Sequence, residues 1–336
     1  MLADEASHDE GLNDMKIIAS SAYVPDRVVT NQDLENLVDT SDEWIQKRTG
    51  IQERRIAVNQ SATEMASQVA KELLADSKID PDAVKLIICA TMSADHSSPS
   101  TAAGVQAAIG ATNAMCFDLA AACSGFVYSL SVASKILASH DQGYAIVIGV
   151  EKMSRIIDWQ DRTTCVLFGD GAGGVLLEAG SDSFVLAEDL KADGSQGQAI
   201  LAGGHNAPNP FNQLESASDF YMQMDGRAVY DFSTRTVPQQ IADVLAGAGK
   251  AVDQIDYFVL HQANRRMLKV MARKLGISPD QLPVNLDKYG NTSAASVPIL
   301  LNELVKEGKI GLDQDQTIVL SGFGGGLTWA SMVIKI

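Results

Sequence analysis

Residues 116–130, Cys116-Phe-Asp-Leu-Ala-Ala-Ala-Cys123-Ser-Gly-Phe-Val-Tyr-Ser-Leu130, place a cysteine among small residues where a helical pattern begins. After Gly125, apolar residues recur every three to four positions, which predicts a helix with one or more buried faces. Cys123 falls in the first turn of that helix, where backbone N–H groups lack partners and the helix dipole is positive. We therefore expect its pKa to lie below the value of about 8.5 for a free thiol. A buried, inert cysteine is the alternative, and this segment alone does not decide between the two.

The length and composition of the chain exclude several classes of protein. With 336 residues, 46% of them hydrophobic, the chain can form one large domain or two closely packed halves. No apolar run approaches the roughly 20 residues that cross a bilayer, and residues 1–14 lack the pattern of a secretory signal. We expect a cytoplasmic protein with no membrane partner. The formal charge of −16 opposes contact with phosphate backbones, so no nucleic-acid partner is expected either.

Residues 1–14 contain five acidic residues and almost nothing to bury. They are interpreted as a disordered acidic leader, and the fold is expected to start at Met15. The cysteines show no Cys-x-x-Cys pair and no neighbouring histidine cluster; they are Cys89, Cys116, Cys123 and Cys165. This spacing favours reduced thiols, and it indicates neither a disulfide framework nor a metal site.

Short apolar runs flanked by turn residues predict buried strands in both halves of the chain. In the first half these runs are 84–90, 144–150 and 174–178, preceded by strands at 15–22 and 28–30; in the second half they are 256–261, 317–321 and 329–336. Between the early strands, Ser61-Ala-Thr-Glu64 has the spacing of a capping box at the start of a helix.

The predicted strands repeat along the chain. An offset of 171 residues carries Lys85 onto Asp256, and one of 172 carries Ala145 onto Thr317. The same offset places Ala295, near the start of another helix, opposite Cys123. The sequence therefore predicts an α/β fold of two duplicated halves, residues 15–180 and 181–336, each a sheet covered by helices and packed around a shared centre.

Two further residues of the second half are candidates for chemistry. His261 ends a predicted strand, and the carboxyl end of a strand is the usual edge for ligand sites in α/β sheets. The other four histidines lie in the leader or in polar or glycine-rich stretches. A hydrogen-bonded structural histidine is the alternative. Asn291 follows Gly290 in a turn that leads into a helix, and taken alone it is an ordinary turn or cap residue.

Two glycine-rich stretches complete the set of candidates. The segment Gly322-Phe-Gly-Gly-Gly-Leu-Thr-Trp329 lies between two predicted strands. Three consecutive glycines make sense where the backbone must approach a ligand closely, and a backbone N–H there can face an oxyanion. The segment Phe168-Gly-Asp-Gly-Ala-Gly-Gly174 lacks the Lys-Ser/Thr of a phosphate loop, and we interpret it as a turn lining the core or the site.

Four motifs together resemble one enzyme family, β-ketoacyl-acyl-carrier-protein synthase III, which starts bacterial type II fatty acid synthesis. They are Ala120-Ala-Ala-Cys123-Ser-Gly-Phe126, His261-Gln-Ala-Asn264, Gly290-Asn-Thr-Ser-Ala-Ala-Ser-Val-Pro298 and Phe323-Gly-Gly-Gly-Leu-Thr-Trp329. The resemblance spans Met15 to Ile336. It implies a thiolase-like fold with mixed sheets in α-β-α-β-α layers, which agrees with the duplication. It also implies no cofactor, no metal, and a homodimer whose central interface shapes the acyl pocket.

The resemblance implies a role for each candidate. Cys123 would take an acyl group, acetyl by default, from acyl-CoA, and the backbone N–H groups of Cys123 and Gly325 would form the oxyanion hole. Decarboxylation of malonyl-acyl carrier protein would then give an enolate that attacks the acyl-cysteine. A neutral imidazole at His261 and the carboxamide of Asn291 would donate hydrogen bonds to the enolate oxygen.

The resemblance also implies binding residues. Coenzyme A would contact Trp44, Arg48 and Arg162 at its adenine end and Asn264 along its pantetheine arm. The acyl pocket would include Ser98, Phe168 and Phe323. Ser98 is small where the acetyl-specific members carry a bulky aromatic residue, so the choice of primer stays open.

The segment 257–279 contains no Asp or Glu but is rich in Lys and Arg. Without the resemblance, a solvated helix face is the favoured interpretation. Because acyl carrier proteins are strongly acidic, the resemblance favours docking of a carrier protein through electrostatic attraction. The residues implied are Gln262, Arg265, Arg266, Lys269 and Arg273.

Other functions stay open from the sequence. A relative of the same fold could use another acceptor or make polyketides, and a comparison of malonyl-acyl carrier protein with malonyl-CoA would separate these. A papain-like hydrolase also uses Cys, His and Asn, but it needs a different fold, and its Cys-Gly-Ser-Cys-Trp signature is absent. A non-catalytic binding module would leave the glycine run unexplained.

Overall fold

The computed structural model describes residues 14–140, 142–183, 185–203 and 220–336, so the predicted leader lies outside the described residues except for Asp14. The helices and strands are β1 (Asp14–Tyr23), β2 (Val28–Thr30), α1 (Asn31–Glu35), α2 (Asp42–Thr49), β3 (Glu53–Arg55), α3 (Ala62–Ser77), β4 (Val84–Ala90), α4 (Thr101–Ile109), β5 (Met115–Leu119), α5 (Gly125–Leu137), β6 (Tyr144–Glu151), β7 (Gly171–Ser183), β8 (Val185–Ala192), β9 (Ile200–Leu201), β10 (Gln223–Met224), α6 (Gly226–Gly247), β11 (Tyr257–Leu260), α7 (Arg265–Leu275), α8 (Leu286–Tyr289), α9 (Ser296–Lys306), β12 (Thr317–Gly324) and β13 (Thr328–Lys335). None of these described helices is long and apolar enough to cross a bilayer.

Two mixed sheets repeat one topology. The first has the strand order β1-β7-β6-β4-β5 and the second the order β11-β12-β13-β8. Strand β4 pairs parallel with β6, as β11 does with β12, and the strands that follow β6 and β12 pair antiparallel; β4 also pairs parallel with β5 on its other side. The series β4-β6-β7-β1 therefore corresponds to β11-β12-β13-β8, and β5 is an additional edge strand. This correspondence confirms the predicted α/β fold with duplicated sheets.

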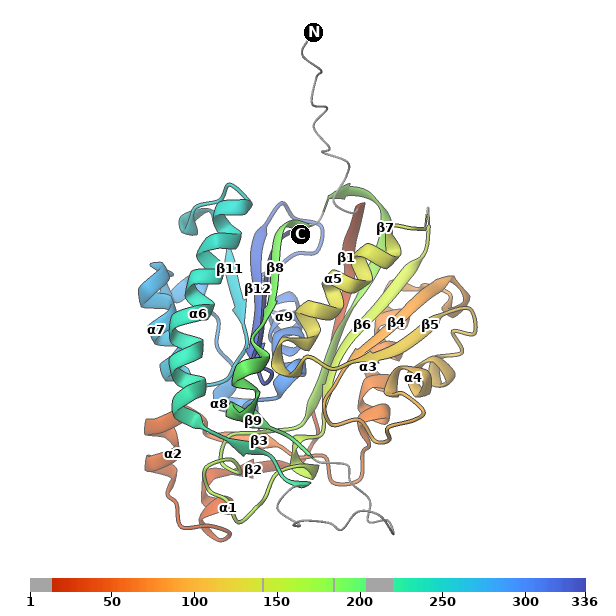
Figure 1. The fold of residues 1–336 in the computed structure, drawn as a ribbon. Helices are drawn as coiled ribbons and strands as arrows, with labels where there is room; N and C mark the ends of the chain where they lie inside the picture. The colour runs from red at the N-terminus through yellow and green to blue at the C-terminus, as the bar shows by residue number, and fades with distance from the viewer. Residues whose placement is uncertain (1–13, 141, 184, 204–219) are drawn as a thin grey trace.

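The helices form three layers around the two sheets (Figure 1). Helices α3 and α4 cover the outer face of the first sheet, and α6, with α7 beside it, covers the second. Helices α5 and α9 lie between the sheets and contact strands of both. Strands β4, β6 and β12 are buried along nearly their whole length, which is why each appears as a continuous apolar run. The α-β-α-β-α layers are as predicted.

The centre of the molecule contains two equivalent turns. The single 3₁₀ turns Ala122–Ser124 and Ser293–Ala295 lead into α5 and α9, and they contact each other. Ala122 and Ser293 both have positive φ, 45° and 49°, a backbone conformation that is uncommon outside glycine. The structural equivalent of Cys123 is therefore Ala294 and not the predicted Ala295. The division of the chain at residues 180 and 181 stays a prediction.

The glycine-rich stretch before residue 175 is a strand where the sequence predicts a turn. Residues 171–174 open β7 and pair with β6 on one side, and residues 172–174 also pair with β1 on the other. A Cβ at Gly173 would lie 2.7 Å from the backbone nitrogen of Ile299. Gly173 is therefore needed because α9 packs directly against this strand, and residues 171–174 do not form a loop.

Candidate active site

A largely apolar pocket of about 450 Å³ brings the three predicted catalytic side chains together. Cys123, His261 and Asn291 all line it, although they are far apart in the sequence. Each lies at the end of an element that points toward the shared centre: Cys123 before α5, His261 after β11, and Asn291 in the turn after α8. The duplication explains this convergence, because equivalent ends of both halves meet at one place.

The cysteine is held on a tight turn beneath the glycine run. Ala122 at positive φ turns the chain so that Cys123 lines the pocket ahead of α5. A Cβ at Gly324 would lie 2.9 Å from both the Cβ and the Sγ of Cys123, so this position has no room for a side chain. Ser124 and Thr328 lock the two turns together: the Ser124 hydroxyl donates to Thr328 Oγ1 at 2.8 Å, and Thr328 Oγ1 donates to the Gly325 carbonyl at 2.8 Å.

The structure contradicts the predicted low pKa of the thiol. Burial raises the pKa of Cys123 to about 12, and the nearby Glu151 carboxylate adds to this rise, although a hydrogen bond with Ser293 opposes it. The helix dipole does not decide the pKa because the sulfur lines a largely apolar pocket and lies near the Glu151 carboxylate. The thiol is therefore protonated at rest.

His261 is 1% exposed and its ring stacks edge-on against Phe323, with 5.2 Å between ring centroids. Burial lowers its pKa to about 3, so the imidazole is neutral at physiological pH, as predicted. Nδ1 is buried without a hydrogen-bond partner. A buried ring nitrogen without a partner costs less free energy as an unprotonated acceptor than as an N–H donor. The unpaired Nδ1 therefore favours the tautomer with the proton on Nε2. That tautomer gives the neutral ring one N–H donor.

Asn291 is 7% exposed and is fixed by its backbone and by its side-chain oxygen. Its backbone pairs with the chain around Phe168: the Asn291 N–H donates to the Leu167 carbonyl at 2.9 Å, and the Gly169 N–H donates to the Asn291 carbonyl at 3.1 Å. The Ser293 N–H donates to Asn291 Oδ1 at 2.8 Å. Because Oδ1 is engaged, the carboxamide NH₂ is the group that can donate to a ligand.

Two polar residues of this centre, Glu151 and Ser293, are not among the predicted site residues. Both are fully buried. The Cys123 thiol donates to Ser293 Oγ at 3.5 Å, and the Ser293 hydroxyl donates to Glu151 Oε1 at 3.0 Å. Burial raises the pKa of Glu151 to about 7, although hydrogen bonds from Ser93, Met92 and Ser293 oppose the rise. The signal was available, because Glu151 is an ionisable residue at the end of a buried strand, as His261 is.

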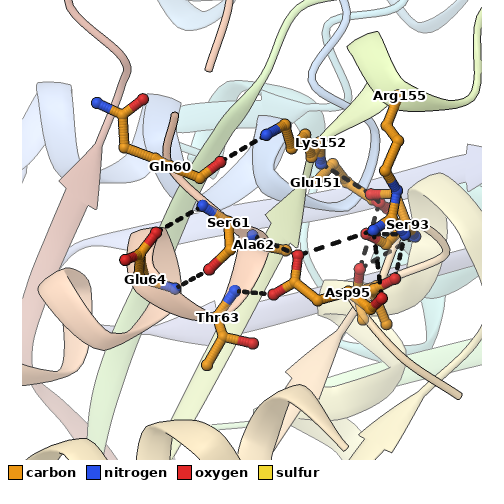
Figure 2. A network of polar contacts seen from close by, with 12 residues as sticks. Gln60, Ser61, Ala62, Thr63, Glu64, Ser93, Asp95, Glu151, Lys152 and Arg155 are labelled. Atoms are coloured by element: carbon orange, nitrogen blue, oxygen red, sulfur yellow. Dashed lines mark hydrogen bonds and ion pairs between the residues drawn. The ribbon is translucent and has the colours of Figure 1, made fainter. Parts of the chain in front are cut away.

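Glu151 lies in a connected polar network at the carboxyl end of β6, a central strand of the first sheet (Figure 2). The Ser93 hydroxyl donates to Glu151 Oε2, and the Lys152 backbone N–H donates to Ser93 Oγ at 2.8 Å. The Lys152 ammonium is directed elsewhere, to the Gln60 carbonyl at 2.7 Å. The carboxylate is therefore held by neutral donors, and no salt bridge joins it to a cation among the described residues.

The predicted coenzyme A residues gather at one side of the pocket. Trp44 and Arg48 line it, and the guanidinium groups of Arg48 and Arg162 lie 5.8 and 5.2 Å from the centroid of the Trp44 ring. Asn264 also lines the pocket, but its side chain is engaged: Oδ1 accepts from the Arg266 N–H, and Nδ2 donates to the Arg48 carbonyl. Asn264 thus caps α7 and ties this helix to α2.

The predicted carrier-protein residues divide into exposed and buried groups. Arg266, Lys269 and Arg273 are exposed on α7, and none of them forms an ion pair within the described part of the chain. Arg265 is half-buried and paired with an aspartate. Gln262 is 1% exposed and bonded to the Leu260 carbonyl and the Asn285 N–H. The prediction that Gln262 contacts a carrier protein is therefore wrong, because its amide is enclosed in the core.

The predicted acyl-pocket and oxyanion residues are partly brought together. Phe168 and Phe323 line the pocket, and so does Gly325 beside Cys123. Ser98 is exposed and does not line the pocket of its own chain. The prediction that Ser98 lines the acyl pocket is therefore wrong for the single chain, because the segment before α4 lies on the surface.

Comparisons with known proteins agree with this geometry. The models of 3-oxoacyl-(acyl-carrier-protein) synthase III match residues 117–194, and those of its C-terminal part match residues 245–336. The chain is 52% identical over 321 residues to β-ketoacyl-acyl-carrier-protein synthase III of Streptococcus mutans, covering 96% of this chain and 99% of the relative.

Solved structures give the same result. The 3-oxoacyl-acyl-carrier-protein synthase III of Aquifex aeolicus is 41% identical with a TM-score of 0.88, and the match covers 96% of this chain and all of that one. A priming β-ketosynthase from a polyketide biosynthetic pathway is 29% identical with a TM-score of 0.89, covering 96% of each chain.

Two mixed sheets of one topology around a half-buried cysteine, a neutral histidine and an asparagine amide define a condensing enzyme of the thiolase fold. This fold excludes the papain-like alternative. The chain belongs to the β-ketoacyl-acyl-carrier-protein synthase III family; it is an acyltransferase, the condensing enzyme that initiates fatty acid synthesis.

Proposed function

We propose that Cys123 receives an acyl group from acyl-CoA and that the enzyme condenses it with malonyl-acyl carrier protein, releasing CoA and CO₂ and giving 3-oxoacyl-acyl carrier protein. The observation that carries this proposal is that Cys123, His261 and Asn291 line one apolar pocket. The names of the relatives support acyl carrier protein as the acceptor.

In the first half-reaction, the sulfur of Cys123 attacks the thioester carbonyl, and the carbonyl oxygen becomes negative. The backbone N–H groups of Cys123 and Gly325 are the proposed donors to this oxygen. The support is the close fit of the glycine run on the cysteine, which keeps side chains away from this point. Backbone donors cost no reorganisation when charge develops, and one such donor is typically worth about 10²–10³ in rate.

In the second half-reaction, loss of CO₂ from the malonyl group leaves an enolate next to the acyl-cysteine. The neutral His261 ring and the Asn291 NH₂ are the proposed donors to the enolate oxygen. Both are uncharged donors in a buried site, so they stabilise the enolate without releasing a proton to it. The enolate carbon then attacks the acyl carbonyl, and Cys123 leaves as a thiolate.

The proposed binding surfaces lie next to each other on one side of the molecule. Trp44 with Arg48 and Arg162 would hold the adenine end of CoA, because a planar ring can stack on the base and two guanidinium groups near it can neutralise phosphate charge. The pantetheine arm would pass Asn264, which lines the pocket. Arg265, Arg266, Lys269 and Arg273 would attract the acidic carrier protein.

A homodimer is part of this proposal. Strand β5 is the edge of the first sheet and carries Met115 at 50% exposure, so the sheet can continue into a second copy. The exposed segment that contains Ser98 could then contribute to the pocket of that copy. Acetyl is the default primer, and the small side chain at this position is compatible with a longer or branched acyl group.

Mass spectrometry tests the proposal directly. Incubation with acetyl-, isobutyryl- or hexanoyl-CoA should leave one acyl group on the chain, and peptide analysis should place it on Cys123. The Cys123→Ala variant should take up none, whereas His261→Ala and Asn291→Ala should acylate normally and lose condensation. A thiol that stays unmodified with every acyl-CoA, or equal loss of acylation in all three variants, would contradict the proposal. Comparing malonyl-acyl carrier protein with malonyl-CoA as extender tests the alternative of a polyketide synthase.

A further inference from the structure

The proposed function leaves one question open, which is where the proton of a thiol with a high pKa goes when the sulfur attacks. His261 is a poor acceptor, because a buried imidazole with a pKa of about 3 resists a positive charge. The structure contains another acceptor within two hydrogen bonds of the sulfur. The buried Glu151 carboxylate, which has no part in the roles assigned so far, accepts from Ser293, and Ser293 accepts from Cys123.

We infer that Ser293 and Glu151 form a proton relay that takes the proton of Cys123 as the sulfur is acylated and returns it when the product leaves. The hydrogen bonds run in one direction, from thiol to hydroxyl to carboxylate, with distances of 3.5 and 3.0 Å. Ser293 contacts the reacting sulfur itself. Glu151 does not contact the sulfur and acts through Ser293. This inference rests on the proposed acylation of Cys123.

The proton balance closes over both half-reactions. In acylation the S–H bond of Cys123 breaks, Ser293 receives that proton and passes its own to Glu151, and CoA leaves as a thiolate that takes a proton from solvent. In condensation the enolate displaces Cys123 as a thiolate, and Glu151 returns the stored proton through Ser293. The complete reaction consumes one proton from solvent, as decarboxylation of a malonyl thioester requires. No oxidant, reductant or further reactant is needed.

The surroundings of Glu151 suit a group that exchanges a proton with its neighbour. The charge of the buried pair stays at −1 whether the proton is on sulfur or on the carboxylate, so the transfer adds no buried charge. Burial raises the pKa of Glu151 to about 7, which lets it be ionised at rest and protonated in the acyl-enzyme. Ser293 is also held firmly, because its N–H donates to Asn291 Oδ1 at 2.8 Å.

The other charged groups around Glu151 are engaged elsewhere. The Lys152 ammonium donates to the Gln60 carbonyl, and the Asp170 carboxylate accepts from the backbone N–H groups of Ala57 and Ser154. Asp95 binds the first turn of α3 and lies near Arg155, whose guanidinium contacts backbone carbonyls, among them that of Ser93 (Figure 2). None of these side chains forms an ion pair with Glu151 in the described residues, whereas the Cys123 thiol is joined to it through Ser293.

The test measures the rate at which Cys123 of the full chain is acylated by acetyl-CoA, without extender, by rapid quenching and intact-mass analysis from pH 5.5 to 9.5. In the wild-type protein the rate should rise through an inflection near pH 7, where Glu151 ionises, and then level off. Glu151→Gln should remove this inflection and lower the rate at pH 7 by about 100-fold, a typical effect of losing one proton acceptor. The KM for acetyl-CoA should not change.

Two serine variants separate a relay from a structural role. Ser293→Ala should lose acylation as Glu151→Gln does, and alanine is compatible with the backbone there because Ala122 has a similar φ at the equivalent turn. Ser93→Ala is the matched control: it removes another hydrogen bond to the same carboxylate but leaves the link to Cys123. Because that bond lowers the pKa of Glu151, the control should keep its maximal rate and move the inflection to higher pH.

A faster or unchanged rate of acylation in the variants would overturn the relay. The Glu151 carboxylate raises the pKa of Cys123, so a carboxylate that acts only through its charge would make Glu151→Gln acylate faster at pH 7. Equal or faster acylation in Glu151→Gln or Ser293→Ala overturns the relay. If Glu151→Gln does not fold, the two serine variants decide. Alkylation of Cys123 by iodoacetamide, followed over the same pH range, gives the comparison without acyl-CoA, so it decides the relay even if no acyl group is accepted.

Discussion

Gly324→Ala should nearly abolish acylation of Cys123 while leaving the fold intact. The added Cβ would lie 2.9 Å from the Cβ and Sγ of Cys123 and 3.2 Å from its backbone nitrogen. Ordinary carbon contacts lie at about 3.5–4.0 Å, so the cysteine or the glycine turn must move by about 0.6–1 Å. A displacement of that size in a reacting group can cost about 100-fold in rate, whereas overpacking of this kind costs about 1–3 kcal/mol of stability.

The assay is the rate of acyl-enzyme formation by rapid quenching, together with thermal denaturation followed by circular dichroism. Gly247→Ala is the control, because its Cβ would meet Ala187 Cβ at an ordinary 3.6 Å at the end of α6. This control should acylate at the wild-type rate. If Gly324→Ala also acylates at the wild-type rate and unfolds at the wild-type temperature, an added Cβ at this position does not displace Cys123, and the reasoning is refuted.

Two other predictions concern the carrier protein and the histidine. The double variant Lys269→Glu with Arg273→Glu should raise the KM for malonyl-acyl carrier protein by about tenfold at low salt, and this effect should shrink as salt is added. Acylation by acyl-CoA should not change. Lys71→Glu on α3 is the control, and an equal rise in KM there would indicate a general effect of charge. Because burial holds the pKa of His261 near 3, the imidazole is neutral above about pH 4, so CO₂ release by the preformed acyl-enzyme should be constant from pH 5 to 8; an inflection near 6.5 would show that the ring protonates.

Most of the fold could be predicted from the sequence because its strands are buried on both faces. Strands such as β4, β6 and β12 therefore appear as short continuous apolar runs, and their repetition indicates the duplication. The capping box at Ser61 is also confirmed at the start of α3. Strand β5 is not predicted because it is a partly exposed edge strand without such a run. The start of β7 is missed because its glycines allow close packing against α9 and β6, which local sequence patterns do not report.

In the candidate site, too, local sequence patterns locate residues but do not show which distant residues surround them. The positions of Cys123, His261 and Asn291 follow from the ends of elements, which a sequence pattern can locate. The pKa of Cys123 could not be predicted, because it depends on a buried neighbour, Glu151, from another strand. The burial of Gln262 was equally hidden, since its partners come from α9 and from the turn before α8.

The two central turns with positive φ have a consequence for how this centre arises at all. One repeat donates the sulfur at Cys123, and the matching place in the other repeat is Ala294, whose neighbour Ser293 reaches across to that sulfur. The two equivalent turns therefore have different roles, and the centre has one nucleophile, which comes from the first half of the chain. Neither repeat, isolated from its counterpart, would possess a working centre.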